Sequence, residues 1–266
     1  MEHFHHQLRM PASQPRHRLE DAIQAALHPA SERNGWDYAT SPATLVATAD
    51  GRPIRSIITG RKKIVTGVYA SRKAGRSLPY ESMNERAFFM HCEVDPGVLD
   101  YRAQPFRLEF LLNGAKRVYI PDCLRLMSDG AVEVVEIKND RRALRDPDYA
   151  LKVGTATNIF EAVGWRFRVI YRRELFEPAS RWLAIYDVQS WRSASFTQSE
   201  VFQVVAAFRN RATVELGALA RRLGGIGEGI AKLKAMAVSR IVALDLSGPI
   251  GLNTRVSLVA ELGEAS

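Results

Sequence analysis

The chain lacks most of the features that mark secreted or membrane proteins. It contains only two cysteines, Cys92 and Cys123, which argues against a disulfide framework and against a zinc site built from closely spaced cysteine pairs. No apolar run approaches the roughly 20 residues that a membrane-spanning helix needs. Residues 1–18 also lack the apolar segment of a secretory signal, so we expect a cytoplasmic protein without membrane attachment.

What the chain has is enough apolar sequence for a core and an excess of positive charge. Its 266 residues are 46% hydrophobic, which allows one large domain or a medium domain with a smaller one. The net charge of +8 favours a polyanionic partner. Residues 1–80 hold 12 Lys and Arg against 6 Asp and Glu, so most of the excess lies in the N-terminal third.

One dense basic run stands out between residues 60 and 77. It permits two interpretations, a solvated surface or an arm that follows the phosphates of double-stranded DNA. The cations of this run are Arg61, Lys62, Lys63, Arg72, Lys73 and Arg76.

Residues 81–175 predict an α/β layer built on a mixed sheet flanked by helices. A helix is expected from Ser82 to about Cys92, and Asp146-Pro147 should open a second helix that Gly164 ends. A strand after that helix implies a crossover and therefore a parallel neighbour. The expected strands are residues 98–101, 106–112, 118–127, 132–138 and 166–171.

The remaining segments suggest a tail and a smaller second domain. Residues 1–35 have no clear periodicity and predict a loose tail, with a short helix near residues 19–27. We assign residues 36–176 to the α/β domain with its basic arm, and residues 177–266 to a C-terminal domain. Helices at 199–210, 213–223 and 226–238 and a strand at 241–246 match either a winged helix-turn-helix or a small helical packing domain.

The most informative segment is a predicted hairpin, residues 119–138. A three-residue loop, Ser128-Asp129-Gly130, with a bulge after it would place Asp122 opposite Glu136. The same register places Leu124, Leu126, Val132 and Val134 on one apolar face and sets Arg125 opposite Glu133, a pair of unlike charge. A two-residue loop would instead separate Asp122 from Glu136, so we prefer the bulged hairpin.

This register has a chemical consequence. Glu136 and Lys138 share a strand face, and opposed Cβ atoms lie about 5 Å apart, so Asp122 and Glu136 would repel unless a cation sat between them. Mg²⁺ prefers oxygen ligands, and Lys138 could neutralise charge on a phosphoryl oxygen. Metal-dependent phosphodiester hydrolysis is therefore the preferred function. The alternative is that both acids end their strands in solvent and Lys138 pairs with one of them.

At this point the sequence resembles a known group of nucleases. Pro121-Asp122 followed by Glu136-Ile137-Lys138 is similar to the PD-(D/E)xK signature of restriction-endonuclease-like enzymes. With the segments 81–85 and 104–106 and Tyr119-Ile120, the ordered set resembles the TnsA family, the endonuclease subunits of heteromeric (Tn7-like) bacterial transposases. The resemblance covers roughly residues 50–175, and more loosely residues 246–254.

The resemblance implies roles for individual residues. Asp122 and Glu136 would be metal ligands for Mg²⁺ or Mn²⁺, Lys138 the catalytic lysine, and Glu85 a further acid that reaches the metal. Glu85 has a competing explanation, because Ser82-x-x-Glu85 is also a helix capping box. Lys152, in the following helix, could meet a DNA phosphate, although a solvated helix face is the preferred interpretation of its position.

The resemblance also implies partners. The family nicks DNA at transposon ends while a separate transferase subunit joins the other strand, and an AAA-type ATPase would regulate the pair. Two other functions stay open, a stand-alone repair or restriction nuclease and a non-catalytic DNA-binding regulator that uses the winged helix.

Overall fold

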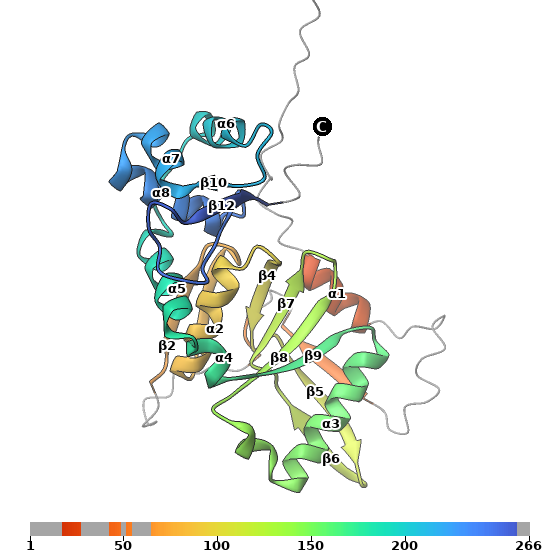
Figure 1. Cartoon of the computed structure of the whole chain (residues 1–266). Coiled ribbons are helices and arrows are strands. Elements are labelled where there is room, and N and C mark those ends of the chain that lie inside the picture. The colour runs from red at the N-terminus through yellow and green to blue at the C-terminus, as the bar shows by residue number, and fades with distance from the viewer. Residues whose placement is uncertain (1–17, 28–42, 49–51, 55–64, 260–266) are drawn as a thin grey trace, which may run out of the picture.

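The computed structural model describes residues 18–27, 43–48, 52–54 and 65–259 (Figure 1). Its centre is a four-stranded sheet in the order β4-β7-β8-β9. Strand β8 pairs with β9 in parallel, and helix α3 (Pro147–Ala162) makes the crossover between them, so the predicted crossover is confirmed. The other pairs of this sheet are antiparallel. The strands are β4 (Val98–Ala103), β7 (Cys123–Met127), β8 (Val132–Lys138) and β9 (Arg166–Tyr171).

Both faces of this sheet are buried, because the side chains of β7 and β8 alternate between two apolar clusters. Leu124, Leu126, Val132 and Val134 form the predicted apolar face and pack with residues of α3. Cys123, Val135 and Ile137 point the other way, toward helices α2 (Met83–Val94) and α5 (Ala179–Trp191). A sheet covered on both sides holds the strand ends in fixed positions.

A second sheet, in the order β1-β5-β6, lies beside the first. It corrects one expectation, since residues 118–127 do not form a single strand. The chain leaves β6 at Tyr119, passes Pro121, which has no N–H for a ladder, and begins β7 in the central sheet at Cys123. The strands of the second sheet are β1 (Ala43–Ala47), β5 (Phe106–Leu112) and β6 (Ala115–Tyr119).

The short helix that the sequence predicts near residues 19–27 is confirmed, since residues 18–27 form helix α1 (Arg18–Leu27). Leu19 is 0% exposed and Ile23 is 5% exposed, so the helix contributes to the core. Glu20 holds it in place, because its carboxylate pairs with the buried Arg102 of β4 at 3.0 Å. Apolar residues on one helix face therefore attach a segment whose polar residues suggested a tail.

A small hairpin carries part of the basic run. Strands β2 (Gly67–Ser71) and β3 (Arg76–Tyr80) pair antiparallel. Short elements complete the first part of the chain, namely η2 (Arg141–Leu144) and α4 (Arg172–Phe176).

The C-terminal elements form a smaller unit with its own apolar cluster. Its sheet has the order β10-β12-β11, and α8 packs against α7, α5 and α2. Ile185 and Val188 of α5 and Val238 of α8 belong to the apolar cluster that also contains α2. The elements are α6 (Gln198–Ala207), β10 (Val214–Glu215), α7 (Leu216–Ala220), η3 (Arg221–Leu223), α8 (Ile226–Val238), β11 (Val242–Leu244) and β12 (Arg255–Leu258). Within the described residues, no helix combines the length and apolar character needed to cross a lipid bilayer.

Candidate active site

The turn between β7 and β8 has the bulged geometry that the sequence predicts. The Met127 N–H donates to the Ala131 carbonyl at 2.8 Å, and Gly130 has a φ of +82°, which glycine adopts without steric cost. The predicted register is confirmed and brings Asp122 to the end of β8. The observed pairs are Leu126 with Val132, Arg125 with Glu133, Leu124 with Val134 and Cys123 with Val135.

Asp122 lies directly before β7, beside the end of β8. Its Oδ2 accepts a hydrogen bond from the Ile137 N–H at 2.6 Å. Burial raises the pKa of Asp122 well above its ordinary value, and the carboxyl groups of Glu136 and Glu85 raise it further. The Ile137 N–H and the Lys138 ammonium act in the opposite direction but do not compensate. Asp122 is thus in electrostatic contact with both of the other predicted acids.

Glu136 is 4% exposed, and both of its carboxylate oxygens are engaged. The Tyr119 hydroxyl donates to Oε2 at 2.6 Å. The Tyr149 hydroxyl donates to Oε1 at 2.7 Å, and the Lys138 Nζ lies 2.6 Å from the same oxygen. Three donors satisfy this buried carboxylate and fix its orientation.

Lys138 is held on one side by this carboxylate and on the other by an aromatic ring. Its Nζ lies 5.0 Å from the centroid of the Tyr149 ring. Burial acts to lower the pKa of Lys138, but the Glu136 carboxylate and the Tyr149 hydroxyl raise it, and the net result lies above the ordinary value. Lys138 is therefore a protonated cation at neutral pH.

Glu85 makes helix-cap contacts that compete with its predicted metal role, although it accepts from the Glu81 N–H and not from the Ser82 N–H of a capping box. The Ser82 hydroxyl donates to Oε1 at 2.8 Å, and the Glu81 N–H donates to Oε2 at 2.9 Å. The Glu85 N–H in turn donates to the Ser82 Oγ at 3.1 Å. The carboxylate thus caps α2, and its charge nevertheless reaches Asp122.

Among the residues that the structure describes, no three His, Cys, Asp or Glu side chains form a group that could hold a metal ion. The donor chemistry still fits a divalent cation, because a half-buried aspartate whose ionisation is opposed by two carboxyl groups is stabilised by positive charge. The Asp122 Oδ1 accepts no hydrogen bond from a described residue, so this oxygen is available. The ligand set of Glu85, Asp122 and Glu136 stays a prediction.

Comparison with protein families places this site in a known context. Residues 95–172 match the family model described as TnsA-like endonuclease N terminal. This segment is TnsA-like. The match includes Asp122, Glu136 and Lys138 and leaves Glu85 outside, and the mixed α/β architecture fits a restriction-endonuclease-like fold. No curated protein matches the chain.

The cations that the sequence suggested as DNA contacts lie in different environments. Arg61, Lys62 and Lys63 lie outside the described residues. The Arg72 guanidinium donates to the Arg192 carbonyl at 2.7 Å, at the end of α5. Lys73 follows Arg72 in the turn of the β2–β3 hairpin, next to the TnsA-like segment.

Lys73 is used inside the fold and does not present its charge as a DNA contact. Its Nζ donates to the carbonyls of Cys92 and Asp95 at 2.7 and 2.6 Å, which caps the C-terminal end of α2. Burial lowers the pKa of Lys73 to about 8. Lys152 lies beside the TnsA-like site, with its Nζ 5.1 Å from the same Tyr149 ring that Lys138 contacts.

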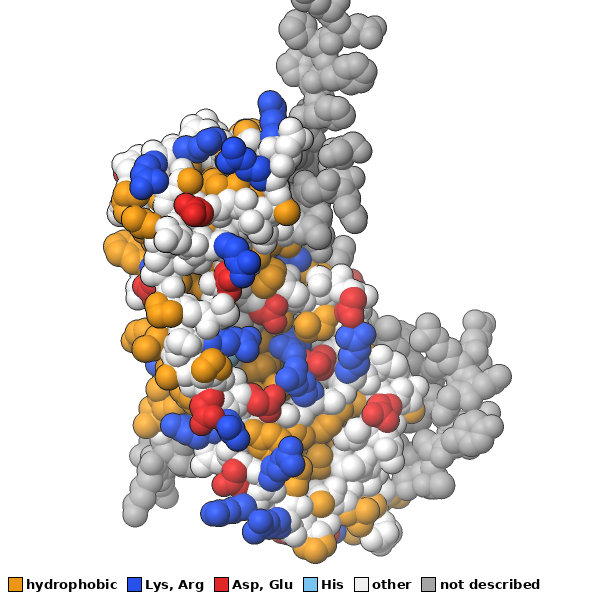
Figure 2. All heavy atoms as spheres, viewed as in Figure 1, with side chains coloured by type: hydrophobic (Ala, Val, Ile, Leu, Met, Phe, Trp, Pro, Cys, Tyr) orange, Lys and Arg blue, Asp and Glu red, His pale blue; other side chains and the backbone are white. Residues whose placement is uncertain are grey.

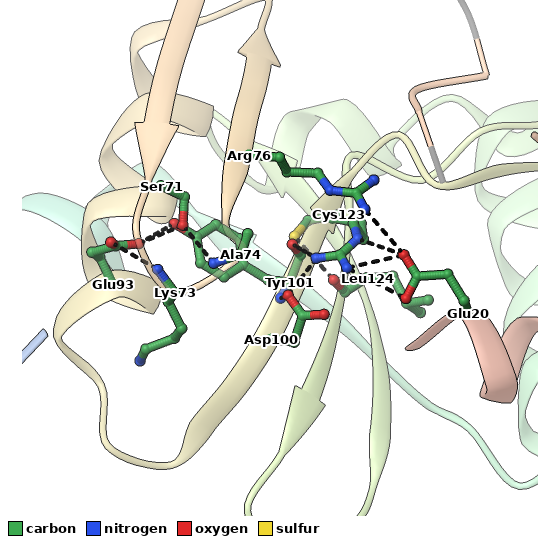
Figure 3. Close-up of polar contacts among 11 residues, drawn as sticks. Glu20, Ser71, Lys73, Ala74, Arg76, Glu93, Asp100, Tyr101, Cys123 and Leu124 are labelled. Carbon is green, nitrogen blue, oxygen red and sulfur yellow. Dashed lines mark hydrogen bonds and ion pairs between the residues drawn. The ribbon is translucent and has the colours of Figure 1, made fainter. Parts of the chain in front are cut away.

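Two tyrosines and one glutamate were not identified from sequence. Tyr119 and Tyr149 hold Glu136 by hydrogen bonds. The signals in the sequence were only that Tyr119 precedes Asp122 by three residues and that Tyr149 follows the helix cap Asp146 by three residues. Glu93 is 0% exposed, and Figure 3 shows it beside Ser71 and Lys73. The Ser71 and Tyr101 hydroxyls donate to Glu93 at 2.7 and 2.6 Å, and so attach α2 to the hairpin and to β4.

Proposed function

We propose that this chain is the TnsA-like endonuclease subunit of a heteromeric transposase and cleaves DNA at transposon ends with Mg²⁺ or Mn²⁺. The observation that carries the proposal is the meeting of Asp122, Glu136 and Lys138 at one strand end within the TnsA-like segment. A half-buried aspartate, a second acid and a protonated lysine are side chains that suit metal-assisted phosphodiester hydrolysis. A catalytically silent scaffold has no need to gather these charges at one place.

Each residue has a role that follows from its contacts. Asp122 would bind the cation through its available oxygen, with Glu85 and Glu136 beside it. A divalent cation bound there supplies Lewis-acid activation of the phosphodiester. Lys138, which is protonated, would stabilise the negative charge that develops on the phosphoryl oxygens. Glu136 orients Lys138 through the contact at 2.6 Å.

The C-terminal elements support a winged-helix assignment. The order α6, β10, α7, α8, β11, β12 and the sheet order β10-β12-β11 match that architecture. We keep residues 36–176 as the nuclease domain and 177–266 as the C-terminal domain. Helix α5 then packs on both, because it contacts α2 and α8.

The partners follow from the proposed subunit role. The substrate would be double-stranded DNA, and a strand-transferase subunit would act on the other strand. An AAA-type ATPase would regulate the assembly. A bacterial cytoplasmic location belongs to the same proposal.

A nicking assay tests the proposal with one pair of matched variants. The full chain is co-expressed with a candidate strand transferase and given plasmid DNA that carries the candidate transposon ends, together with Mg²⁺ or Mn²⁺. Asp122→Asn keeps the side-chain shape and should lower the nicking rate at least about a hundredfold while the protein stays folded. Asp129→Asn in the exposed turn is the control and should nick at the wild-type rate. Full activity of Asp122→Asn would refute the nuclease assignment.

The same assay distinguishes the alternatives. A stand-alone repair or restriction nuclease would cut without the transferase and without transposon ends. A non-catalytic regulator would bind DNA but show no nicking and no Asp122-dependent binding of Mn²⁺ in a metal titration. The proposed function requires both the nicking and the metal binding.

A further inference from the structure

Helix α8 occupies the place of a DNA-recognition helix, but it offers no available positive charge. Its exposed first positions are Ile226, Gly227 and Glu228. Recognition helices contact DNA mainly through residues near their N-terminal ends, and a carboxylate there repels phosphate. A DNA contact through α8 would therefore depend on its two lysines, Lys232 and Lys234.

Both lysines of α8 are engaged in ion pairs. The Lys232 Nζ lies 2.5 Å from a carboxylate oxygen of Glu200 and 2.5 Å from one of Glu228. Lys234 is 4% exposed and pairs with Asp187 of α5 at 2.8 Å. The second half of α8 is buried against α7, α5 and α2, so this helix serves packing.

The loop between β11 and β12, residues 245–254, has no available cation either. Arg255, which follows it, pairs with Asp245 at 3.0 Å. Hydrogen bonds from Ser247, together with Arg255, lower the pKa of Asp245 to about 2, so the carboxylate is ionised and neutralises the arginine. A wing that contacts DNA in the usual way needs a cation that is free to meet a phosphate.

Four other arginines between α6 and β12 are exposed, and their side chains make no ion pair or hydrogen bond with a described residue. We call them the arginine face, and they are Arg209, Arg211, Arg221 and Arg222. The first two follow the end of α6 and the last two lie in η3, which packs against α6. Figure 2 shows Lys and Arg side chains gathered over α6 and α7 at this end of the molecule.

Basic residues outnumber acidic residues in the part of the chain that carries this face. Residues 198–258 contain eight Lys and Arg and four Asp and Glu, an excess of four positive charges. Glu200 and Glu228 are paired with Lys232, and Asp245 is paired with Arg255. The excess is therefore as large as the number of arginines in the face.

We propose that the arginine face binds the phosphate backbone of double-stranded DNA without reading its sequence, in place of α8. Guanidinium groups donate paired hydrogen bonds that match phosphate oxygens, and exposed arginines on η3 and just after α6 can contact more than one phosphate. The inference rests on the proposed function only for the identity of the ligand. It assigns to this domain a contact that adds affinity and leaves sequence selection to other contacts.

The test measures DNA binding by the full chain in the absence of cleavage. A fluorescent duplex of random sequence is titrated in EDTA over a range of salt concentrations, with all proteins in the Asp122→Asn background. The face variant carries R209Q, R211Q, R221Q and R222Q. Each phosphate contact contributes about 0.9 to the slope of log K against log salt concentration, so the slope should fall by about 2 to 4 and the affinity at low salt at least about tenfold.

A control variant removes the same charge from exposed ion pairs elsewhere, and it should keep the wild-type slope. It carries K116Q, R166Q, R168Q and R173Q, whose cations pair with Glu109, Asp129, Glu174 and Glu177. Arginine-to-lysine changes at the four face positions should restore most of the slope. Unchanged melting temperatures show that all variants are folded.

Two outcomes would overturn the inference. A face variant with the wild-type slope would mean that the face binds an acidic protein or nothing. Equal losses in the face and control variants would mean that only the net charge matters. If Asp122→Asn nicks normally but the face variant still loses DNA binding, the proposed function fails and this inference stands.

Discussion

Tyr119→Phe removes one hydroxyl from the candidate site and leaves the packing of the ring in place. The hydroxyl donates to the Glu136 Oε2 at 2.6 Å, and the two residues are 3% and 4% exposed, so water cannot take its place. Loss of a hydrogen bond to a charged group costs about 1.5–3 kcal/mol. We expect the free energy of unfolding to fall by about 2 kcal/mol.

Tyr149→Phe should cost less, although its hydroxyl is at a similar distance from the same carboxylate. Tyr149 is partly exposed, so water can replace the lost donor, and the Lys138 ammonium stays on the same oxygen. We expect a loss below about 1 kcal/mol. Tyr186→Phe is the matched control, because Tyr186 is 48% exposed and its hydroxyl contacts no described residue; it should change stability by less than about 0.5 kcal/mol.

Urea unfolding at neutral pH, followed by circular dichroism, measures these differences. A double-mutant cycle with Glu136→Gln then assigns the loss to the carboxylate, and the coupling should be larger for Tyr119 than for Tyr149. A loss in Tyr119→Phe no larger than that of the control, or a larger loss in Tyr149→Phe, would refute this account of how Glu136 is held.

Two further predictions concern buried charges. Burial lowers the pKa of Lys73 to about 8, from an ordinary value of 10.5, so the folded protein releases this proton at a lower pH than the unfolded chain does. Relative to Lys73→Met, the wild-type free energy of unfolding should be constant below pH 8 and should rise by up to about 1.4 kcal/mol per pH unit from pH 8 to pH 10.5. Urea unfolding across this pH range measures the difference between the two proteins. A difference that does not change with pH would contradict the prediction. Glu133→Gln removes the ion-pair partner of Arg125, which is 7% exposed, and should lower the free energy of unfolding by about 3–5 kcal/mol in the same assay. Glu177→Gln breaks an exposed ion pair and should lower it by less than about 1 kcal/mol. Similar losses in the two variants would argue against a buried pair.

The β7–β8 hairpin could be predicted from sequence because its determinants are local. The glycine at position 130 fits the left-handed turn, and the alternation of apolar residues allows one register only. Helix α3 was predictable for the same reason, since Asp146 and Pro147 open it and Gly164 follows its end. Asp122, Glu136 and Lys138 were brought together by these local rules alone.

The other parts depend on contacts between distant segments, which single-sequence patterns do not contain. The chain divides between two sheets at Pro121 because β6 finds its partner in β5. Tyr149 reaches Glu136 only after α3 has packed across the sheet. Lys73 was expected on a solvated surface or as a DNA contact, and its burial depends on the docking of its hairpin against Glu93 of α2, about twenty residues further along the chain.

That docking also links the two ends of helix α2. Glu93, near one end, is fixed by hydroxyls of Ser71 and Tyr101, whereas Glu85, about 12 Å away along the helix axis, faces Asp122. A helix transmits a displacement along its axis, so any shift of the β2–β3 hairpin moves the Glu85 carboxylate by a similar amount. The position of Glu85, one of the proposed catalytic acids, is therefore set partly by contacts of Glu93 that touch none of these acids.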